Sequence, residues 1–262
     1  MSIISELLSF SNVHDEWHEL LSNSLQSVDT EYLKNLMTDD EWLPGTNRLF
    51  SAFQRDRQHC QYILFGESPY PRKQSANGIA FYDAAVNDIW SVNGLSKTVN
   101  RATSLRNIIK TALIAEQHIQ ALTDGSVPQS LIANINKQNL VPSIDALFLN
   151  FSQAGFLMFN ATPVLHPQRT PRVEARYWIH FIEQLLNGIS QSSDYPMPTL
   201  VLWGKISQLI QQIPSSSAFK QIQCEHPYNL SFIHHPAMLK LFSRIKIMQR
   251  ENNSALKQEV FK

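Results

Sequence analysis

The 262-residue sequence lacks a long apolar run, a recognisable leader and a set of cysteines. No stretch approaches the roughly 18 apolar residues of a membrane-spanning helix, so we expect no transmembrane segment. The first ten residues have neither the basic start nor the small-residue cleavage site of a secretion signal. The two cysteines, Cys60 and Cys224, are far apart and not in metal-binding spacing. These absences favour a cytoplasmic protein with reduced cysteines and no bound metal.

The sequence also lacks a net charge, since 22 Lys and Arg balance 22 Asp and Glu. The charges are unevenly spread. Residues 1–60 hold ten acidic and four basic side chains, whereas residues 61–262 hold twelve acidic and eighteen basic ones. Two interpretations of the resulting balances of −6 and +6 stay open. One is ordinary surface scatter, and the other is a basic face for nucleic acid in the later part of the chain.

Four short apolar stretches predict buried strands. They are mostly apolar on both faces, as is typical of parallel strands covered by helices. The stretches are YILFG (62–66), FLMFN (156–160), TLVLWG (199–204) and QIQCEH (221–226). Apolar residues make up 43% of the chain, which is enough for a sizeable core.

Segments of helical period lie between and around these stretches. Residues 104–122 have Ser104 at the expected N-cap, and residues 13–56, 176–190 and 238–252 have similar patterns. Alternating strands and helices predict an α/β fold with a central four-stranded, mainly parallel sheet flanked by helices. No repeat or linker interrupts the pattern, so residues 1–262 are predicted to form a single domain.

Polar residues follow each predicted strand, where ligands of parallel sheets bind. Glu67 and Ser68 follow the first, Asn160 ends the second, Lys205 follows the third, and His226 ends the fourth. We therefore expect a functional site at this edge of the sheet.

Several motifs resemble those of the uracil-DNA glycosylase superfamily, over roughly residues 17–250. The family's GQDPY, HGLAFS, SLLN, LLLN, LLWG and HPSPLS are matched, in this order, by GESPY (66–70), NGIAFY (77–82), SLRN (104–107), LMFN (157–160), VLWG (201–204) and HPYNLS (226–231). The resemblance implies the fold described above. It also implies a monofunctional DNA glycosylase that flips a uracil or modified pyrimidine out of DNA and hydrolyses its N-glycosidic bond, as a monomer without cofactor or metal.

The resemblance also implies roles for single residues. Substrate binding falls to Tyr70, which would exclude thymine, Phe81, which would stack on the base, and Asn160, which would read its edge. Catalysis falls to His226, Glu67 and Ser68, and contacts with DNA to Ser104, Lys205, Leu230 and Ser231. Each position also has an ordinary structural interpretation, such as a core aromatic ring, a loop-capping amide, a structural histidine or a solvated charge.

One departure affects catalysis, because the family's aspartate is Ser68 here. Glu67 is the nearest substitute for its negative charge. A related branch of the superfamily has GEAPG and an iron–sulfur cluster on four cysteines, which two cysteines cannot hold. The segment 82–103 is also longer than usual, which is either a neutral insertion or room for a bulkier base.

Three hypotheses follow. The first is an active glycosylase, in DNA repair or in defence against phage DNA with modified cytosines. The second is a DNA-binding member that has lost catalysis, as the missing aspartate suggests. The third, an unrelated hydrolase, has little support because the chain contains no G-x-S-x-G motif.

Overall fold

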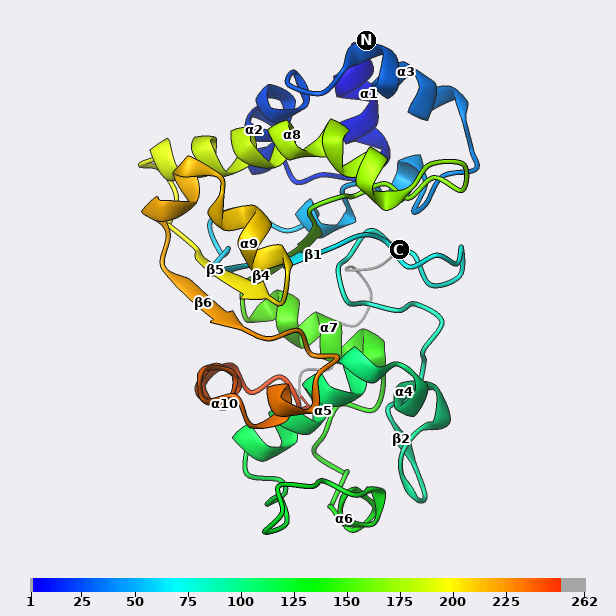
Figure 1. The fold of residues 1–262 in the computed structure, drawn as a ribbon, viewed down its shortest axis with the longest axis vertical. Coiled ribbons are helices and arrows are strands. Elements are labelled where there is room, and N and C mark those ends of the chain that lie inside the picture. Colours follow the sequence, from blue (N-terminus) through cyan, green and yellow to red (C-terminus); the bar gives the residue numbers. More distant parts are fainter. Residues whose placement is uncertain (1, 251–262) are drawn as a thin grey trace. The chain divides into compact units, whose positions relative to one another are not determined.

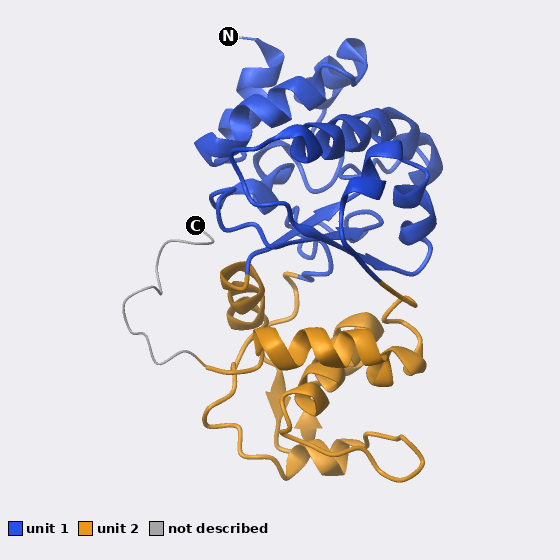
Figure 2. Cartoon of the chain, turned by 90° about the vertical axis from the view of Figure 1, so that its left-hand side faces the viewer, with its two compact units in different colours: residues 1–83, 155–222 blue, residues 84–154, 223–262 orange. Residues whose placement is uncertain are grey.

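The computed structural model describes residues 2–250, which form two compact units (Figure 2). Unit 1 comprises residues 1–83 and 155–222, and unit 2 comprises residues 84–154 and 223–262. The single domain over residues 1–262 therefore stays a prediction. None of the helices in the described part of the chain is long and apolar enough to cross a membrane.

The central sheet has four strands in the order β4-β1-β5-β6 (Figure 1). These strands are β1 (Tyr62–Gly66), β4 (Phe156–Asn160), β5 (Thr199–Trp203) and β6 (Gln221–Cys224). Strand β1 runs parallel to both β4 and β5, and Gly66 pairs with Asn160 at the end of its ladder with β4. The predicted sheet is confirmed. Gly204, Glu225 and His226 lie just beyond the strands that were predicted to include them.

The core of unit 1 lies on one face of this sheet. Alternate strand residues point into it because successive side chains of a strand face opposite sides. They are Ile63, Phe65, Leu157, Phe159, Leu200 and Leu202. The helices that complete this core are α1 (Ile3–Phe10), α2 (Asp15–Leu25), α3 (Thr30–Thr38) and α8 (Pro171–Gln191), and α8 presents apolar residues from Trp178 to Ile189 at helical spacing.

Helix α8 carries a buried carboxylate, Glu174, whose charge is satisfied within unit 1. Its oxygens accept hydrogen bonds from Tyr32 and Arg169. The indole nitrogen of Trp178 donates to the Tyr32 hydroxyl at 2.9 Å. Since a buried charge is costly unless it is paired, this network holds α3 and α8 together in one geometry.

Short elements complete unit 1. Helix α9 (Ile206–Gln211) follows β5. The 3₁₀ helices are η1 (Thr46–Arg48), η2 (Ser51–Phe53) and η3 (Pro214–Ala218). Helices α2, α3, η1 and η2 account for much of the helical pattern predicted over residues 13–56.

Unit 2 is mainly helical, with a small hairpin. The hairpin strands are β2 (Trp90–Ser91) and β3 (Gly94–Leu95). The helices are α4 (Lys97–Arg101), α5 (Thr103–Ala115), α6 (Gln129–Ala133), α7 (Ile144–Gln153), η4 (Leu230–His234) and α10 (Pro236–Ile245). Helix α5 packs against both η4 and α10.

Two predicted helices have different ends in the structure. The helix predicted over 104–122 ends at Ala115, because Gln117 adopts a left-handed backbone with φ 63°. The helix predicted over 238–252 ends at Ile245 because Lys246 has φ 52°, and its residues 251–252 lie outside the described residues. The prediction of Ser104 as N-cap is wrong, since Ala102 occupies that position and Ser104 lies inside the helix.

The end of α5 contains a buried acid that makes stability depend on pH. The fully buried Glu116 side chain accepts a hydrogen bond from the Met248 backbone at 2.9 Å and lies 3.5 Å from His118 Nε2. Burial raises the pKa of Glu116 to about 7. An unfolded glutamate has a pKa of ~4.3. Between these values the folded state binds more protons, so this residue lowers the free energy of unfolding as pH rises.

We predict that Glu116→Gln, which cannot ionise, gains stability relative to the parent as pH is raised from about 5 to about 8. Urea unfolding midpoints at both pH values measure this difference. Glu31→Gln, a change at an exposed residue of α3, should show no such trend. A stability difference for Glu116→Gln that is equal at both pH values would contradict the prediction.

Candidate functional site

The end of β1 meets the end of β4 in a close approach that requires glycine at position 66. A Cβ on Gly66 would lie 2.3 Å from Asn160 Oδ1 and 2.7 Å from the Ala80 Cβ, far inside contact distance. Backbone hydrogen bonds continue the approach, from Ala161 to the Gly66 carbonyl at 2.9 Å and from Thr162 to the Glu67 carbonyl at 3.0 Å. The Asn160 side chain is therefore held directly over Gly66.

Asn160 is almost completely buried, with 4% of its surface exposed. Within the part of the chain that the structure describes, its side-chain amide makes no hydrogen bond. It does not cap its own loop. The amide atoms do not belong to the fully buried polar atoms without partners among the described residues, so they keep a small accessible surface through which a ligand can bind. The amide offers both a donor and an acceptor in one plane.

Phe81 follows Ala80, which borders the same space over Gly66 as the Asn160 amide. The Ala80 backbone donates to the Met158 carbonyl at 3.0 Å, which fixes the segment beside β4. Phe81 itself has a left-handed backbone with φ 64°, an uncommon conformation for a bulky residue. Its ring meets the buried Trp203 ring edge-on, with centroids 4.9 Å apart. The half-buried ring is thus held in one orientation at the end of β5.

Tyr70 is hydrogen-bonded to the segment that carries Phe81. Its hydroxyl donates to the Phe81 carbonyl at 3.4 Å. Burial, and next the nearby Asp83 charge, raise the pKa of Tyr70 to about 12, so the phenol stays neutral. Unit 1 therefore brings together Tyr70, Phe81 and Asn160, all three of the predicted substrate-binding residues.

Asp83 is a carboxylate that the sequence analysis missed. It is 3% exposed and forms an ion pair with Arg72, at 3.0 Å between Oδ2 and Nη2. The pair joins the two ends of the segment 72–83, which carries Phe81 and follows Tyr70. Its place directly after NGIAFY is the signal that points to it in the sequence.

Glu67 and Ser68 occupy the turn that follows β1. Glu67 is exposed, and its carboxylate makes no hydrogen bond or ion pair among the described residues, although its backbone is held by Thr162. Ser68 is half-buried. Lys205, the exposed N-cap of α9, follows Gly204 at the end of β5. These three side chains lie at the strand ends of unit 1, as the sequence predicts.

His226 begins a tight turn in unit 2. Its Nδ1 accepts a hydrogen bond from the Tyr228 backbone at 3.1 Å, and its carbonyl accepts one from Asn229 at 2.9 Å. An imidazole that accepts at Nδ1 carries its proton on Nε2 when neutral. The turn therefore presents Nε2 as a donor.

Asn107 supports this turn from α5, a role that the sequence analysis did not foresee although SLRN contains it. The fully buried side chain donates to the Pro227 carbonyl at 2.7 Å and to the Asn229 carbonyl at 3.3 Å. Leu230 and Ser231 follow on the exposed start of η4, and Leu230 is 70% exposed. Ser104 lies half-buried in the first turn of α5.

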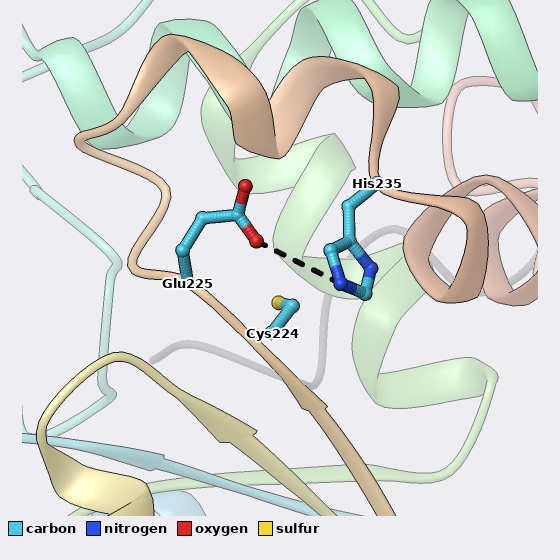
Figure 3. Close-up of side chains that lie close together, drawn as sticks. All are labelled: Cys224, Glu225 and His235. Atoms are coloured by element: carbon cyan, nitrogen blue, oxygen red, sulfur yellow. Dashed lines mark ion pairs between the residues drawn. The ribbon is translucent and has the colours of Figure 1, made fainter.

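Cys224, Glu225 and His235 form a cluster in unit 2 (Figure 3). Glu225 Oε2 lies 3.7 Å from His235 Nε2. Burial tends to raise the pKa of Glu225, but a hydrogen bond from Ser231 and the His235 charge hold it below its usual value. This ion pair joins residues on both sides of the turn that carries His226.

The cluster has the three ligand types of a zinc site, within 4.8 Å of one another. Its donors fit a metal poorly. Burial and the Glu225 charge raise the pKa of the Cys224 thiol, so a metal would have to displace its proton. His235 Nδ1 is buried and has no hydrogen-bond partner in the described structure, whereas a metal-bound histidine usually donates its second N–H. We interpret the cluster as an ion pair that holds together the two ends of the loop between Glu225 and His235.

The ten predicted site residues are divided between the two units. Unit 1 holds Glu67, Ser68, Tyr70, Phe81, Asn160 and Lys205, and unit 2 holds Ser104, His226, Leu230 and Ser231. That all ten serve one site stays a prediction.

Comparisons with known proteins agree on one kind of relative, although no family model matches the chain. The crystal structure of wild-type UNG from Nitratifractor salsuginis is 36% identical, with a TM-score of 0.87 over 95% of this chain and 97% of that one. A uracil-DNA glycosylase of Corynebacterium glutamicum is 24% identical over 207 residues, which are 76% of this chain and 74% of the relative. One from varicella-zoster virus is 24% identical over 86% of this chain and 64% of the relative.

We predict that Gly66→Ala lowers the free energy of unfolding by about 1–3 kcal/mol, the usual cost of overpacking. Thermal and urea unfolding measure the loss. Part of it should disappear in the Asn160→Ala background, where the closest clash is removed. Gly188→Ala is the control, since its Cβ would approach only the flexible Leu20 side chain. Unchanged stability in Gly66→Ala would show that a Cβ at position 66 fits beside Asn160 and Ala80.

Proposed function

Because this chain belongs to the uracil-DNA glycosylase superfamily and is a DNA glycosylase, we propose that it excises uracil from DNA by hydrolysing the N-glycosidic bond. The observation that carries the proposal is the Asn160 amide, which is nearly buried, held over Gly66 and without a hydrogen-bond partner in the described chain. A pyrimidine edge with adjacent O4 and N3–H matches the donor and acceptor of that amide.

The neighbouring side chains supply the remaining contacts to a flipped-out base. The oriented Phe81 ring stacks on the face of the uracil. Tyr70, bonded to the Phe81 carbonyl, lies along the C5 edge and excludes the methyl group of thymine. Stacking, edge recognition and exclusion thus come from one end of the unit 1 sheet.

The leaving base gathers negative charge as the bond breaks, and His226 stabilises it. Its Nε2–H, set by the hydrogen bond that Nδ1 accepts from Tyr228, donates to the base O2. A donor aimed at developing charge contributes more in the transition state than in the ground state. Glu67 supplies the negative charge that stabilises the cationic sugar.

The DNA itself is held at its phosphates and at the gap that the flipped base leaves. Lys205, Ser104 and Ser231 contact phosphates. The exposed Leu230 enters the gap as a wedge. In this proposal the protein acts as a monomer in the cytoplasm, where its two free cysteines stay reduced.

A modified pyrimidine is the second candidate substrate. It is favoured by Ser68 at the place of the family's aspartate and by the longer segment over residues 82–103. A bulkier base, such as a modified phage cytosine, would make the protein a defence enzyme rather than a repair enzyme. A catalytically inactive DNA-binding protein is the alternative that Ser68 by itself favours.

We predict that the protein releases uracil from DNA and that Asn160→Ala and His226→Ala each slow the release about a hundredfold, the loss typical of one transition-state donor. Duplexes with uracil, hydroxymethylcytosine, glucosylated cytosine or thymine are incubated with the protein, and abasic sites are counted. Uracil should be cleaved and thymine should not.

Thermal unfolding of both variants serves as the control, because a loss of activity counts only where the fold is retained. Release of a modified cytosine without release of uracil would favour the defence function. Tight DNA binding without any abasic product would favour the inactive DNA-binding protein. Full activity in both variants would overturn the assignment of the site.

We predict that Glu67→Gln lowers turnover about a hundredfold while DNA affinity stays nearly unchanged, because the amide keeps the shape but loses the charge. Ser68→Ala should cost little, and Ser68→Asp should retain or raise uracil release. Single-turnover rates and binding constants measure both quantities.

Asp83→Asn is the matched comparison, because Asp83 is the other carboxylate of this segment and is already paired with Arg72. It should reduce stability more than turnover. Normal turnover in Glu67→Gln would remove Glu67 from the mechanism, and activity that arises only with Ser68→Asp would identify the parent as a DNA-binding protein.

A further inference from the structure

The turn that begins at His226 exposes two large apolar side chains, of which the function proposed above uses only one. Leu230 is 70% exposed, and Tyr228, two residues earlier, is 67% exposed. Among the described residues, the Tyr228 ring has no aromatic or cationic neighbour and its hydroxyl makes no hydrogen bond. An aromatic side chain of this size that is two-thirds exposed is available for a ligand.

The backbone beneath Tyr228 is held on both sides. The Tyr228 N–H donates to His226 Nδ1 at 3.1 Å, the Asn229 N–H donates to the His226 carbonyl at 2.9 Å, and Asn107 donates to the Pro227 carbonyl at 2.7 Å. The backbone of the turn is therefore preorganised, so it loses little conformational freedom when the Tyr228 ring binds a ligand.

The rest of the loop is anchored in unit 2. Phe232 and Ile233 of η4 are buried, and His234 Nε2 lies 2.6 Å from the Gly125 carbonyl. The Glu225–His235 ion pair joins the start of the loop to its end (Figure 3). Tyr228 and Leu230 therefore project from one fixed base.

The two side chains are two residues apart along the chain. A chain advances at most about 3.6 Å per residue, so the two Cα atoms lie within about 7 Å of each other. Successive bases of one DNA strand are ~3.4 Å apart, which is within this limit. A ring at position 228 thus reaches the base next to a gap that Leu230 occupies.

We propose that Tyr228 stacks on the base flanking the flipped nucleotide, so that this protein enters DNA with two side chains rather than one. The inference rests on the proposed function, since it needs a nucleotide that is flipped out and excised. Stacking on an aromatic ring does not depend on base identity, because every base has a π-face. Tyr228 is a positioning residue that keeps the flanking base in place and the gap open.

The test compares single-turnover uracil release by the parent, Tyr228→Ala, Tyr228→Phe and Leu122→Ala. The substrate is a duplex with one uracil. Tyr228→Ala should lose about tenfold in rate, the size expected for one base–aromatic stack. Tyr228→Phe should retain the parent rate because it keeps the ring. Leu122→Ala, which removes another exposed apolar side chain of unit 2, should match the parent.

A second pair of duplexes identifies the stacking partner. In each, one base flanking the uracil is replaced by an abasic tetrahydrofuran residue, on the 5′ side or the 3′ side. On one of them the parent should slow to the rate of Tyr228→Ala, and the two proteins should then be equal. A purely structural role of Tyr228 would leave the difference between them unchanged on every duplex.

The outcomes separate this inference from the proposed function. A parent that releases no uracil contradicts the proposed function. A parent that is active while Tyr228→Ala matches it overturns the stacking role. A Tyr228→Phe variant as slow as Tyr228→Ala also overturns it, because the hydroxyl would then matter rather than the ring. If Tyr228→Ala unfolds at a lower temperature than the parent, the Tyr228→Phe variant and the two abasic duplexes still test the stacking role.

Discussion

The close approach of β1 and β4 at Gly66 is the constraint on which the unit 1 site depends. The Asn160 amide occupies space that the Cβ of any other residue at position 66 would need. Ala80 presses against the same point, and Phe81 follows with a left-handed backbone. One missing side chain therefore lets a buried amide and an oriented ring lie at the same end of a parallel sheet, where such sheets bind ligands.

Two buried asparagines in this protein show how hydrogen bonding separates structure from function. Asn107 is fully buried, and carbonyl groups of the turn after His226 satisfy its amide. Asn160 is nearly as buried, but no group in the described chain satisfies its amide. The Asn107 amide is therefore explained by the loop that it supports, whereas the Asn160 amide is available to the ligand proposed above.

The same contrast separates the two carboxylates near the base-binding residues. Asp83 is buried and its charge is balanced by Arg72. Glu67 is exposed at the turn after β1, and no partner in the described chain balances its charge. The absence of a cationic neighbour is the reason that we propose Glu67, rather than Asp83, for the role of the aspartate that Ser68 replaces.

Much of the fold was determined by the sequence itself. Strands β1, β4 and β5 are short runs that are mostly apolar on both faces, and burial on both sides of a sheet demands that pattern locally. Strand order then follows from few choices, so the polar residues at the strand ends were also predictable. The helix ends were less predictable. Gln117 and Lys246 end their helices with left-handed backbones, a conformation that neither residue type favours.

Only the tertiary structure decided which of these residues form hydrogen bonds and ion pairs with one another. Asn107 reaches across 120 positions to the Pro227 carbonyl, and Asp83 becomes a buried ion-pair partner of Arg72. The sequence shows an asparagine and an aspartate in each case, but hydrogen bonding and burial are properties of pairs. Whether Asn160 caps a loop or waits for a base, and whether Tyr228 is packed or exposed, depends on neighbours that are distant along the chain and that only folding brings close.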